Sequence, residues 1–355
     1  MDHKYSVALV AMLIVGVLTG YLAAVMVFTP RATTVVETVT IVNTVTKPIE
    51  LKRVSVIDAF GRLIVFEKTP SRVVSLAPST TEKIFALGLD EVVVGVDSYS
   101  NYPQRVLELV NAGRITVVGG PWTPDPEKII ALKPELVLMC RGVRPQETLY
   151  PKLEEAGIKT VFLLCDNAKN LYDIFSDLHV IGTIFGVEEK AKSISNELER
   201  KVSEISLKLK EANVSKRRVL VLIGPPSWGI YSVGGDTFIG WLINSVDGIN
   251  IAGVYSGWPR LDYEFILHND PEVIIITAHG IDPKEIYKEL SNTPIARTSA
   301  WLEERVYLFT DEANDVLSRP GPRIVTALEI LAHILHPEVF GELQRVDVYR
   351  VTEAT

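Results

Sequence analysis

Short apolar runs alternate with amphipathic stretches along residues 53–339. Uninterrupted apolar runs bounded by turn residues predict buried strands at 72–76, 92–96, 135–140, 160–164, 218–223, 272–277 and 305–309. Apolar residues at helical spacing predict helices between them, at 79–87, 126–132, 145–156, 236–245, 263–268 and 323–336. Buried strands separated by helices are typical of α/β proteins whose parallel sheets are covered by helices on both faces.

A repeat divides this region into two halves. Five residues recur 137 positions later without a gap: Asp125, Glu127, Ile129, Pro134 and Glu135 return as Asp262, Glu264, Ile266, Pro271 and Glu272. Each copy predicts a short helix, a proline turn and a buried strand. Units of this kind resemble one another in general, but five ungapped identities favour two related, Rossmann-like lobes.

A single long helix is predicted between the halves, over residues 187–212. Its apolar residues follow one stripe at steps of three and four, and its other faces carry charges. Glu197 and Lys201, and Glu204 and Lys208, are four apart in the order that stabilises a helix. A coiled-coil dimer helix is the alternative, but the stretch is shorter than four heptads. We therefore expect a rigid connection between two lobes.

The N-terminal region has a different character. Residues 5–28 contain no charged side chain, and as a helix they would extend about 36 Å, enough to cross a bilayer core. The apolar part of a cleaved signal peptide is only about 7–15 residues long. We expect residues 1–30 to be a transmembrane anchor or an uncleaved signal, and the Thr- and Val-rich residues 31–52 to be a stalk, either extended or disordered.

Composition and missing motifs exclude several classes of function. The 355 residues carry a formal net charge of −8 and no block of Lys and Arg, which argues against general nucleic-acid binding. Phosphate-binding, dinucleotide-binding, serine-hydrolase and zinc-protease motifs are absent, so we predict neither an enzyme nor a resident cofactor or metal. Cys140 and Cys165 follow neighbouring predicted strands and are either disulfide-bonded or two buried thiols.

Ligands of open α/β sheets bind outside the carboxyl ends of the strands. Here the segments after the predicted strands are rich in aromatic side chains and add a few charges: Tyr99, Trp122, Arg141, Trp228, Tyr231, Trp258, Asp315 and Arg319. Such a set suits a large, flat ligand with polar edges. The alternative for any one ring is packing beneath its own loop. His279 also ends a predicted strand, but a single histidine is weak evidence of a site.

Four motifs carry a resemblance to a known family. They are residues 72–88 (RVVSLAPSTTEKIFALG), 95–103 (GVDSYSNYP), 127–134 (EKIIALKP) and 319–323 (RPGPR). The chain resembles the substrate-binding proteins of ABC importers, in the branch that binds cobalamin, iron-siderophores and haem, and is most similar to vitamin B12-binding proteins. The resemblance spans residues 53–339. It implies two lobes bridged by one long helix, a ligand cleft between them, and delivery to a membrane permease dimer driven by a cytoplasmic ATPase.

The resemblance also implies roles for particular residues. Glu127 and Glu264, the pair related by the repeat, match the glutamates that dock each lobe onto permease arginines. Tyr99, Trp122, Trp258, Asp315 and Arg319 match or fall near ligand contacts, and Trp228 or Tyr231 would replace a phenylalanine. Cys140 departs from the pattern because the family has a tryptophan there, which leaves cobalamin, an iron-siderophore and haem all open as the chelate.

These observations predict six segments: an anchor at 1–30, a stalk at 31–52, an N-terminal lobe at 53–169, a helical linker at 170–215, a C-terminal lobe at 216–340 and a tail at 341–355. The predicted function is capture of a corrinoid or related metal chelate outside the cytoplasm by a body tethered to the cell membrane. Two other classes stay open: a membrane-anchored enzyme on the same scaffold, and an adhesion or sensory module without a transporter.

Overall fold

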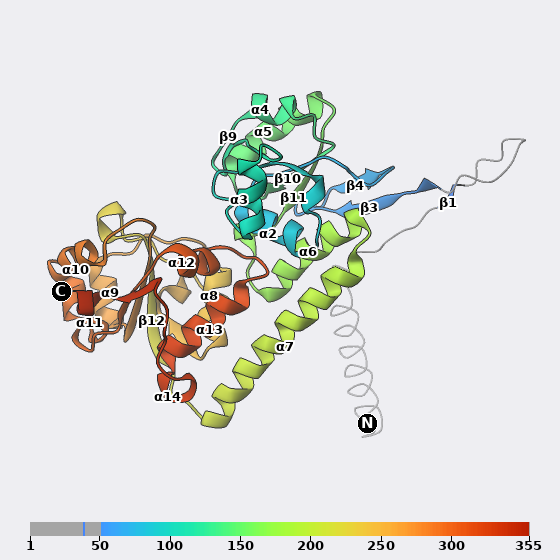
Figure 1. The fold of residues 1–355 in the computed structure, drawn as a ribbon. Helices are drawn as coiled ribbons and strands as arrows, with labels where there is room; N and C mark the ends of the chain where they lie inside the picture. The colour runs from blue at the N-terminus through green and yellow to red at the C-terminus, as the bar shows by residue number, and fades with distance from the viewer. Residues whose placement is uncertain (1–37, 40–50, 355) are drawn as a thin grey trace, which may run out of the picture.

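The computed structural model describes residues 38–39 and 51–354 (Figure 1). The predicted anchor at 1–30 and most of the predicted stalk at 31–52 lie outside the described residues. From the stalk region, β1 (Thr38–Val39) pairs antiparallel with β2 (Leu51–Lys52). Within the part of the chain that is described, none of the helices has both the length and the apolar character that a membrane crossing requires.

The N-terminal lobe is built on a five-stranded sheet in which every pairing is parallel, in the order β11-β10-β5-β6-β7. Its strands are β5 (Val73–Ser75), β6 (Val93–Val96), β7 (Thr116–Val117), β10 (Leu136–Cys140) and β11 (Lys159–Leu163). Its helices are α2 (Pro78–Ala86), α3 (Gln104–Asn111), α4 (Pro126–Ala131) and α5 (Arg144–Glu155). Two hairpins accompany the sheet: β3 (Val54–Ile57) with β4 (Leu63–Phe66), and β8 (Gly119–Gly120) with β9 (Thr123–Pro124).

The C-terminal lobe repeats this plan with a sheet in the order β13-β12-β14-β15-β16. Its pairings are parallel except that β16 runs antiparallel to β15. The strands are β12 (Arg217–Ile223), β13 (Gly248–Asn250), β14 (Val273–Thr277), β15 (Val306–Phe309) and β16 (Val348–Arg350). The helices are α8 (Phe238–Ser245), α9 (Tyr263–Asn269), α10 (Pro283–Ser291), α11 (Ser299–Leu302), α12 (Asp311–Ser318), α13 (Ile324–Leu335) and α14 (Pro337–Phe340).

The central strands are apolar throughout because both of their faces are covered. In β10, Leu136 and Leu138 belong to the core cluster on one face of the sheet, and Val137 and Met139 to the cluster on the other. All five residues of β10 and all five of β14 are buried. Layers of helices on both faces (Figure 1) explain why these strands show no alternation of polar and apolar residues.

The repeat found in the sequence occupies equivalent places in the two lobes. Asp125 and Asp262 are the N-cap residues of α4 and α9, and each side chain accepts a hydrogen bond from the backbone N–H three residues later, at 3.0 and 2.7 Å. The strands that follow hold equivalent places: β10 lies between β5 and β11, and β14 lies between β12 and β15. The recurring aspartates are therefore explained by helix capping.

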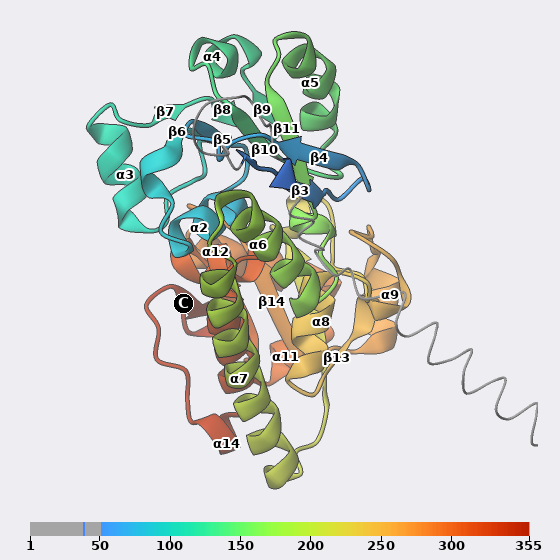
Figure 2. The same cartoon turned by 90° about the vertical axis from the view of Figure 1, so that its right-hand side faces the viewer.

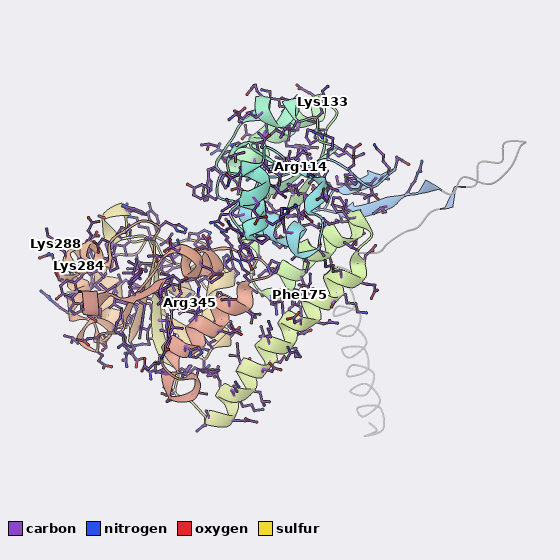
Figure 3. The ribbon with its side chains drawn as sticks, viewed as in Figure 1. Arg114, Lys133, Phe175, Lys284, Lys288 and Arg345 are labelled. Atoms are coloured by element: carbon purple, nitrogen blue, oxygen red, sulfur yellow. A yellow bond between two sulfur atoms is a disulfide. The ribbon has the colours of Figure 1, made fainter. Side chains whose placement is uncertain are left out.

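Two helices, and not one, connect the lobes. The predicted long helix is α7 (Glu188–Ala212), and it packs against α6 (Leu171–Phe185), which the pattern of apolar residues did not reveal. The first half of α6, including Phe175 (Figure 3), belongs to the core of the C-terminal lobe, and its second half, including Ile181, belongs to the core of the N-terminal lobe. Figures 1 and 2 show α7 running from the N-terminal lobe to the far end of the C-terminal lobe, near α14. The single bridging helix is thus corrected to a helical hairpin.

Other local predictions also need correction. Residues 311–315 were expected in a loop, but they begin α12, with Asp311 in its first turn. On α7, Glu197 pairs with Lys201 as predicted, whereas Glu204 pairs with Arg200 and not with Lys208.

The short 3-10 turns are η1 (Asp90–Val92), η2 (Cys165–Asn167), η3 (Pro226–Trp228), η4 (Ile251–Val254), η5 (Pro294–Arg297) and η6 (Val351–Ala354).

Candidate functional site

The two lobes meet where the segment after β6 contacts the C-terminal end of α12. Arg319 donates hydrogen bonds to the carbonyl of Tyr99 at 3.1 Å and to the Asn101 side-chain oxygen at 2.7 Å. The amide of Asn101 in turn donates to Asp315 at 3.2 Å. Asp315 and Arg319, predicted as ligand contacts, pair with each other at 2.7 Å, and each side chain is only 8% exposed. Their partners are therefore protein groups, both on the facing lobe and within the C-terminal lobe itself.

Glu82 on α2 is the acidic centre of this junction. Its carboxylate pairs with Arg319 at 3.1 Å and with Arg323 at 2.5 Å, and its side chain is 3% exposed. Arg323 also lies 3.7 Å from the ring centre of Tyr102, a cation–π contact. We call Glu82, Asp315, Arg319 and Arg323 the interlobe ion cluster. Burial alone would lower the pKa of the Arg323 guanidinium, but the hydrogen bond and charge of Glu82 outweigh it and hold that pKa above its usual value.

A second buried pair lies beside the interlobe ion cluster. The fully buried Lys83 ammonium contacts Asp177 on α6 at 3.3 Å and donates to the carbonyl of Pro320 at 2.8 Å. Asp177 also accepts the backbone N–H groups of Leu164 and Cys165, at 2.7 and 3.0 Å. A buried cation is tolerated only where such partners replace its hydration. Lys83 therefore ties the N-terminal lobe to the linker and to residues 319–323.

The predicted aromatic residues of the N-terminal lobe lie together. The rings of Tyr99 and Trp122 are 6.1 Å apart, edge to face, and the two residues are 52% and 59% exposed. The β8–β9 hairpin that carries Trp122 needs glycine at Gly119, where φ is +100° and a Cβ atom would lie 2.3 Å from the carbonyl oxygen of Thr123. The buried Gln146 side chain supports this hairpin by donating to the carbonyls of Pro121 and Leu76.

The predicted aromatic residues of the C-terminal lobe are exposed and come from two segments, one between β12 and α8 and the other between η4 and α9. Trp228 is 63% exposed, and its ring packs over Gly224, where a Cβ atom would come within 2.5 Å of it. Tyr231 is 41% exposed, and its backbone forms a bridge with Arg260. Trp258 is 45% exposed, with its ring 6.4 Å from that of Phe238. Among the described residues, none of these three rings is paired with Tyr99 or Trp122.

Arg141 is engaged differently from the other predicted site residues. It donates to the carbonyl of Ala59 at 3.0 Å, and its guanidinium lies 5.3 Å from the ring centre of Phe60. These contacts attach the turn after β10 to the turn between β3 and β4. The structure does not place Arg141 against the rings of Tyr99 or Trp122.

Cys140 and Cys165 form a disulfide that joins the carboxyl ends of β10 and β11. The next residue, Asp166, keeps exposed surface, although neighbouring protein atoms crowd its carboxyl group. Desolvation raises the pKa of its carboxyl to about 6, against the opposing charge of Lys83. Burial likewise raises the pKa of Asp97, at the end of β6, although the Ser100 hydroxyl and the Tyr99 N–H donate to it. Acidic groups thus border the junction on the N-terminal side.

Several of these residues were not singled out from the sequence. The available signal was a charged pair, Glu82-Lys83, inside an otherwise uncharged helix, together with two arginines around Pro-Gly-Pro at 320–322. His279 was noted only weakly, and its Nε2 lies 3.3 Å from Asp315. A hollow of about 570 Å³ lies elsewhere, along β13 beside Asp236, Asn250 and Val254, and none of the predicted site residues lines it.

Glu127 and Glu264 occupy matching exposed positions in the first turns of α4 and α9. Figure 1 shows α4 and α9 on different lobes, well away from α7. Glu127 pairs with Lys152 at 2.6 Å, and this pairing holds the pKa of Glu127 below its usual value. Within the described residues, Glu264 has no ion pair.

A profile of the family described as periplasmic binding protein matches residues 73–313. The chain belongs to this family. A Bacillus subtilis protein described as an uncharacterized ABC transporter substrate-binding lipoprotein is 30% identical over 294 residues, 82% of this chain and 88% of that protein. A cobalamin-binding protein of Halobacterium salinarum is 29% identical over 79% of this chain and 73% of its own length.

Solved structures confirm the fold of this family member. A periplasmic heme-binding protein from Pseudomonas aeruginosa superimposes with a TM-score of 0.68 at 22% identity, over 79% of this chain and 97% of the other.

Residues 51–354 hold no group of three or more His, Cys, Asp and Glu side chains arranged to bind a metal ion. The family consists of substrate-binding transport proteins, and the fold with two parallel sheets is the one expected from the sequence.

Proposed function

We propose that this chain is an extracytoplasmic solute-binding protein that captures a corrinoid or related metal chelate and delivers it to an ABC importer. The observation that carries the proposal is the set of exposed rings that follow strands of both lobes, in a family with a cobalamin-binding relative. Exposed apolar rings that gather into one patch indicate a ligand or partner site, whereas single exposed rings are common on any protein surface. A flat chelate would cover them.

The proposed contacts divide into two groups. Tyr99, Trp122, Trp228, Tyr231 and Trp258 would cover the faces of the ligand, because their rings are exposed. Arg141 is exposed at the end of β10 and would contact a polar edge. Asp315 and Arg319 are buried among protein partners, so we propose that they act by fixing the position of Tyr99 and of the facing lobe. A siderophore or haem is the alternative ligand within the family.

Equilibrium titration of the full-length chain in detergent tests the ligand. Tryptophan fluorescence should fall on addition of cobalamin, haemin or a ferric siderophore, with a dissociation constant in the micromolar range or tighter. Tyr349→Phe, a change at an exposed ring on β16, is a control that should bind normally. Failure of all three chelates to bind would refute the proposed function.

The delivery step is proposed to use Glu127 and Glu264. One carboxylate on each lobe suits a permease dimer that presents cationic side chains on both halves, since complementary charges set the register of docking. Glu127 forms an ion pair with Lys152, whereas Glu264 forms no ion pair among the described residues. We therefore expect Glu264→Lys to reduce uptake more than Glu127→Lys does.

This docking proposal is tested by uptake into vesicles that contain the permease and its ATPase. Both lysine variants should bind the chelate normally and transport it more slowly, and Glu67→Lys, at an exposed pair with Arg53, should transport normally. Unchanged uptake by the double variant Glu127→Lys/Glu264→Lys would reject docking through these residues. We further propose that residues 1–30 anchor the body on the outer side of the membrane, because such a permease accepts its ligand there.

A further inference from the structure

The hairpin formed by β3 and β4 carries apolar side chains on a face that the core does not use. Its register pairs Val56 with Ile64 and Ile57 with Leu63. Val56 is 4% exposed and belongs to the core of the N-terminal lobe, whereas Ile57 and Leu63 are 64% and 65% exposed. Because alternate residues of a strand point to opposite faces, Ile57 and Leu63 lie side by side on the outer face of the hairpin.

Phe60 adds a third exposed apolar side chain in the turn that joins the two strands. It is 46% exposed, and its ring meets that of Phe162 edge to face, with the ring centres 4.9 Å apart. We call Ile57, Phe60 and Leu63 the hairpin tip. Single exposed apolar residues, such as Leu302 on α11, are ordinary, but three of them within seven positions indicate a surface that a partner covers.

The charge that the hairpin tip exposes is positive. Asp58 and Arg62 are the only ionisable residues from 57 to 63, and they pair with each other at 2.6 Å. The Asp58 side chain is fully buried and also accepts the backbone N–H groups of Phe60 and Arg62, both at 3.0 Å. The Arg62 side chain is 26% exposed. An anionic partner at this turn would therefore meet a guanidinium and not a carboxylate.

The hairpin follows directly on the segment that leads to the proposed anchor. Residues 5–28 contain no charged side chain, and 22 residues, 29–50, separate them from Leu51, where β2 begins. One residue then separates β2 from β3. Figure 1 shows β3 and β4 beside β1, on the side of the N-terminal lobe away from the C-terminal lobe. A link of 22 residues spans at most about 75 Å, so an anchor at 5–28 keeps the hairpin tip within reach of the bilayer surface.

We propose that the hairpin tip rests on the phospholipid bilayer to which the chain is anchored. The inference rests on the anchor proposed for residues 1–30 and goes beyond the proposed ligand and its delivery. Ile57, Phe60 and Leu63 enter the boundary between the head groups and the acyl chains, as the apolar side chains of other interfacial segments do. The Arg62 guanidinium contacts the lipid phosphates. Three side chains alone bind a membrane weakly, but a short tether raises the effective concentration of the surface to roughly millimolar.

The lipid contact and the proposed docking onto a permease use different residues. Glu127 and Glu264 lie in the first turns of α4 and α9, and Figure 1 shows both helices apart from the β3–β4 hairpin. Contact of the hairpin tip with lipid therefore leaves both carboxylates uncovered.

A fluorescent label at the hairpin tip tests the contact. The two cysteines of the chain form one disulfide, so Leu63→Cys introduces the only free thiol, which is labelled with the environment-sensitive dye NBD. The full-length chain is reconstituted into vesicles of phosphatidylcholine and phosphatidylglycerol that contain no permease. Lipids brominated in their acyl chains should quench the label on the order of twofold. Leu302→Cys, at a leucine 71% exposed on the C-terminal lobe, is the matched control, whose label should not be quenched.

A second substitution tests the apolar character of the hairpin tip. Ile57→Asp, added to the labelled Leu63→Cys chain, removes an apolar side chain and adds a charge that lipid phosphates repel, so most of the quenching should be lost. Its melting temperature should not change, because Ile57 is 64% exposed. Val346→Asp, at an apolar residue 90% exposed in another segment, should keep the quenching. Chelate binding should be the same in both variants.

The outcomes separate the lipid contact from the other proposals. Equal emission and equal quenching at Leu63→Cys and Leu302→Cys, or quenching that Ile57→Asp leaves unchanged, overturns the lipid contact while the solute-binding function stands. Stronger emission at Leu63→Cys without quenching by brominated lipid means that protein, such as a second copy of this chain, covers the hairpin tip, and it overturns the lipid contact as well. If the chain does not sediment with the vesicles, the anchor proposed for residues 1–30 fails, and this contact fails with it.

Discussion

Removing the charge of Glu82 should uncouple the two lobes. Glu82→Gln keeps the shape of the side chain but leaves Arg319 and Arg323 facing a neutral amide, whose N–H groups point at cations. The side chains of Glu82, Arg319 and Arg323 are 3%, 8% and 11% exposed. Water therefore cannot replace the lost carboxylate at its full strength.

The magnitude follows from burial and from the partners that remain. Breaking a buried pair by removing one partner costs about 3–5 kcal/mol. Here Arg319 keeps Asp315 at 2.7 Å and Arg323 keeps Glu312 at 3.2 Å, so we expect the low end, about 3 kcal/mol. For a body of this size that corresponds to a melting temperature lower by roughly 5–10 °C.

Calorimetry and urea unfolding provide the assay. Because Glu82 and Arg319 belong to different lobes, the loss should also separate the unfolding of the two lobes into two transitions. Glu67→Gln is the matched control: its pair with Arg53 has side chains 57% and 42% exposed, and such a pair contributes only about 0–1 kcal/mol.

A double-mutant cycle that combines Glu82→Gln with Arg323→Gln isolates the interaction between Glu82 and Arg323. Residues in direct contact within one network usually show a coupling energy of about 0.5–3 kcal/mol. A coupling energy below about 0.5 kcal/mol, together with a single unchanged unfolding transition in Glu82→Gln, would refute the reasoning that the interlobe ion cluster holds the lobes together.

Three further predictions follow from individual groups. Hydrogen bonds from Lys68 and Ser71 lower the pKa of Glu135 to about 2, so the stabilising contribution of Glu135 is complete above about pH 4.5 and is lost as the pH falls toward 2. In urea unfolding, Glu135→Gln should therefore lose less stability than the native chain between pH 4.5 and 2, and identical pH profiles would contradict this. The pKa of Asp166 is raised to about 6, so its ionised carboxylate destabilises the fold, and Asp166→Asn should stabilise the protein at pH 8 but have little effect near pH 4. Carboxyl NMR that shows Asp166 titrating near pH 4 would reject desolvation as the cause. Trp122→Ala should weaken chelate binding on the order of tenfold without lowering the melting temperature, since the ring is 59% exposed, and unchanged affinity would remove Trp122 from the proposed site.

Much of the fold could be read from local patterns. The seven predicted strands and six predicted helices all occur, with ends shifted by a residue or two, because burial on both faces demands continuous apolar runs. Helix α6 was missed because it is apolar around most of its circumference, ten of its fifteen residues being buried. Residues 311–315 were misassigned because four of these five side chains are acidic or Asn, and Asp and Asn are common in loops.

The candidate site was only partly predictable. The exposed rings, together with Asp315 and Arg319, were found because they follow predicted strands, but the partners of Asp315 and Arg319 were not found. Glu82 and Arg319 are 237 positions apart, and no spacing rule relates residues at such a distance. His279 stood alone in the sequence, and only the structure places its Nε2 atom 3.3 Å from Asp315.

The amino-acid sequence by itself determined the two related lobes, their parallel sheets, the capped repeat and the family, because each of these is a property of short segments or of their recurrence. The tertiary structure decided which charges lie between the lobes, which cysteines bond and which imidazole faces a fixed carboxylate. Those outcomes depend on how two sheets are placed against each other, and a buried charge shows its role only when its partner, hundreds of residues away, lies within hydrogen-bonding distance.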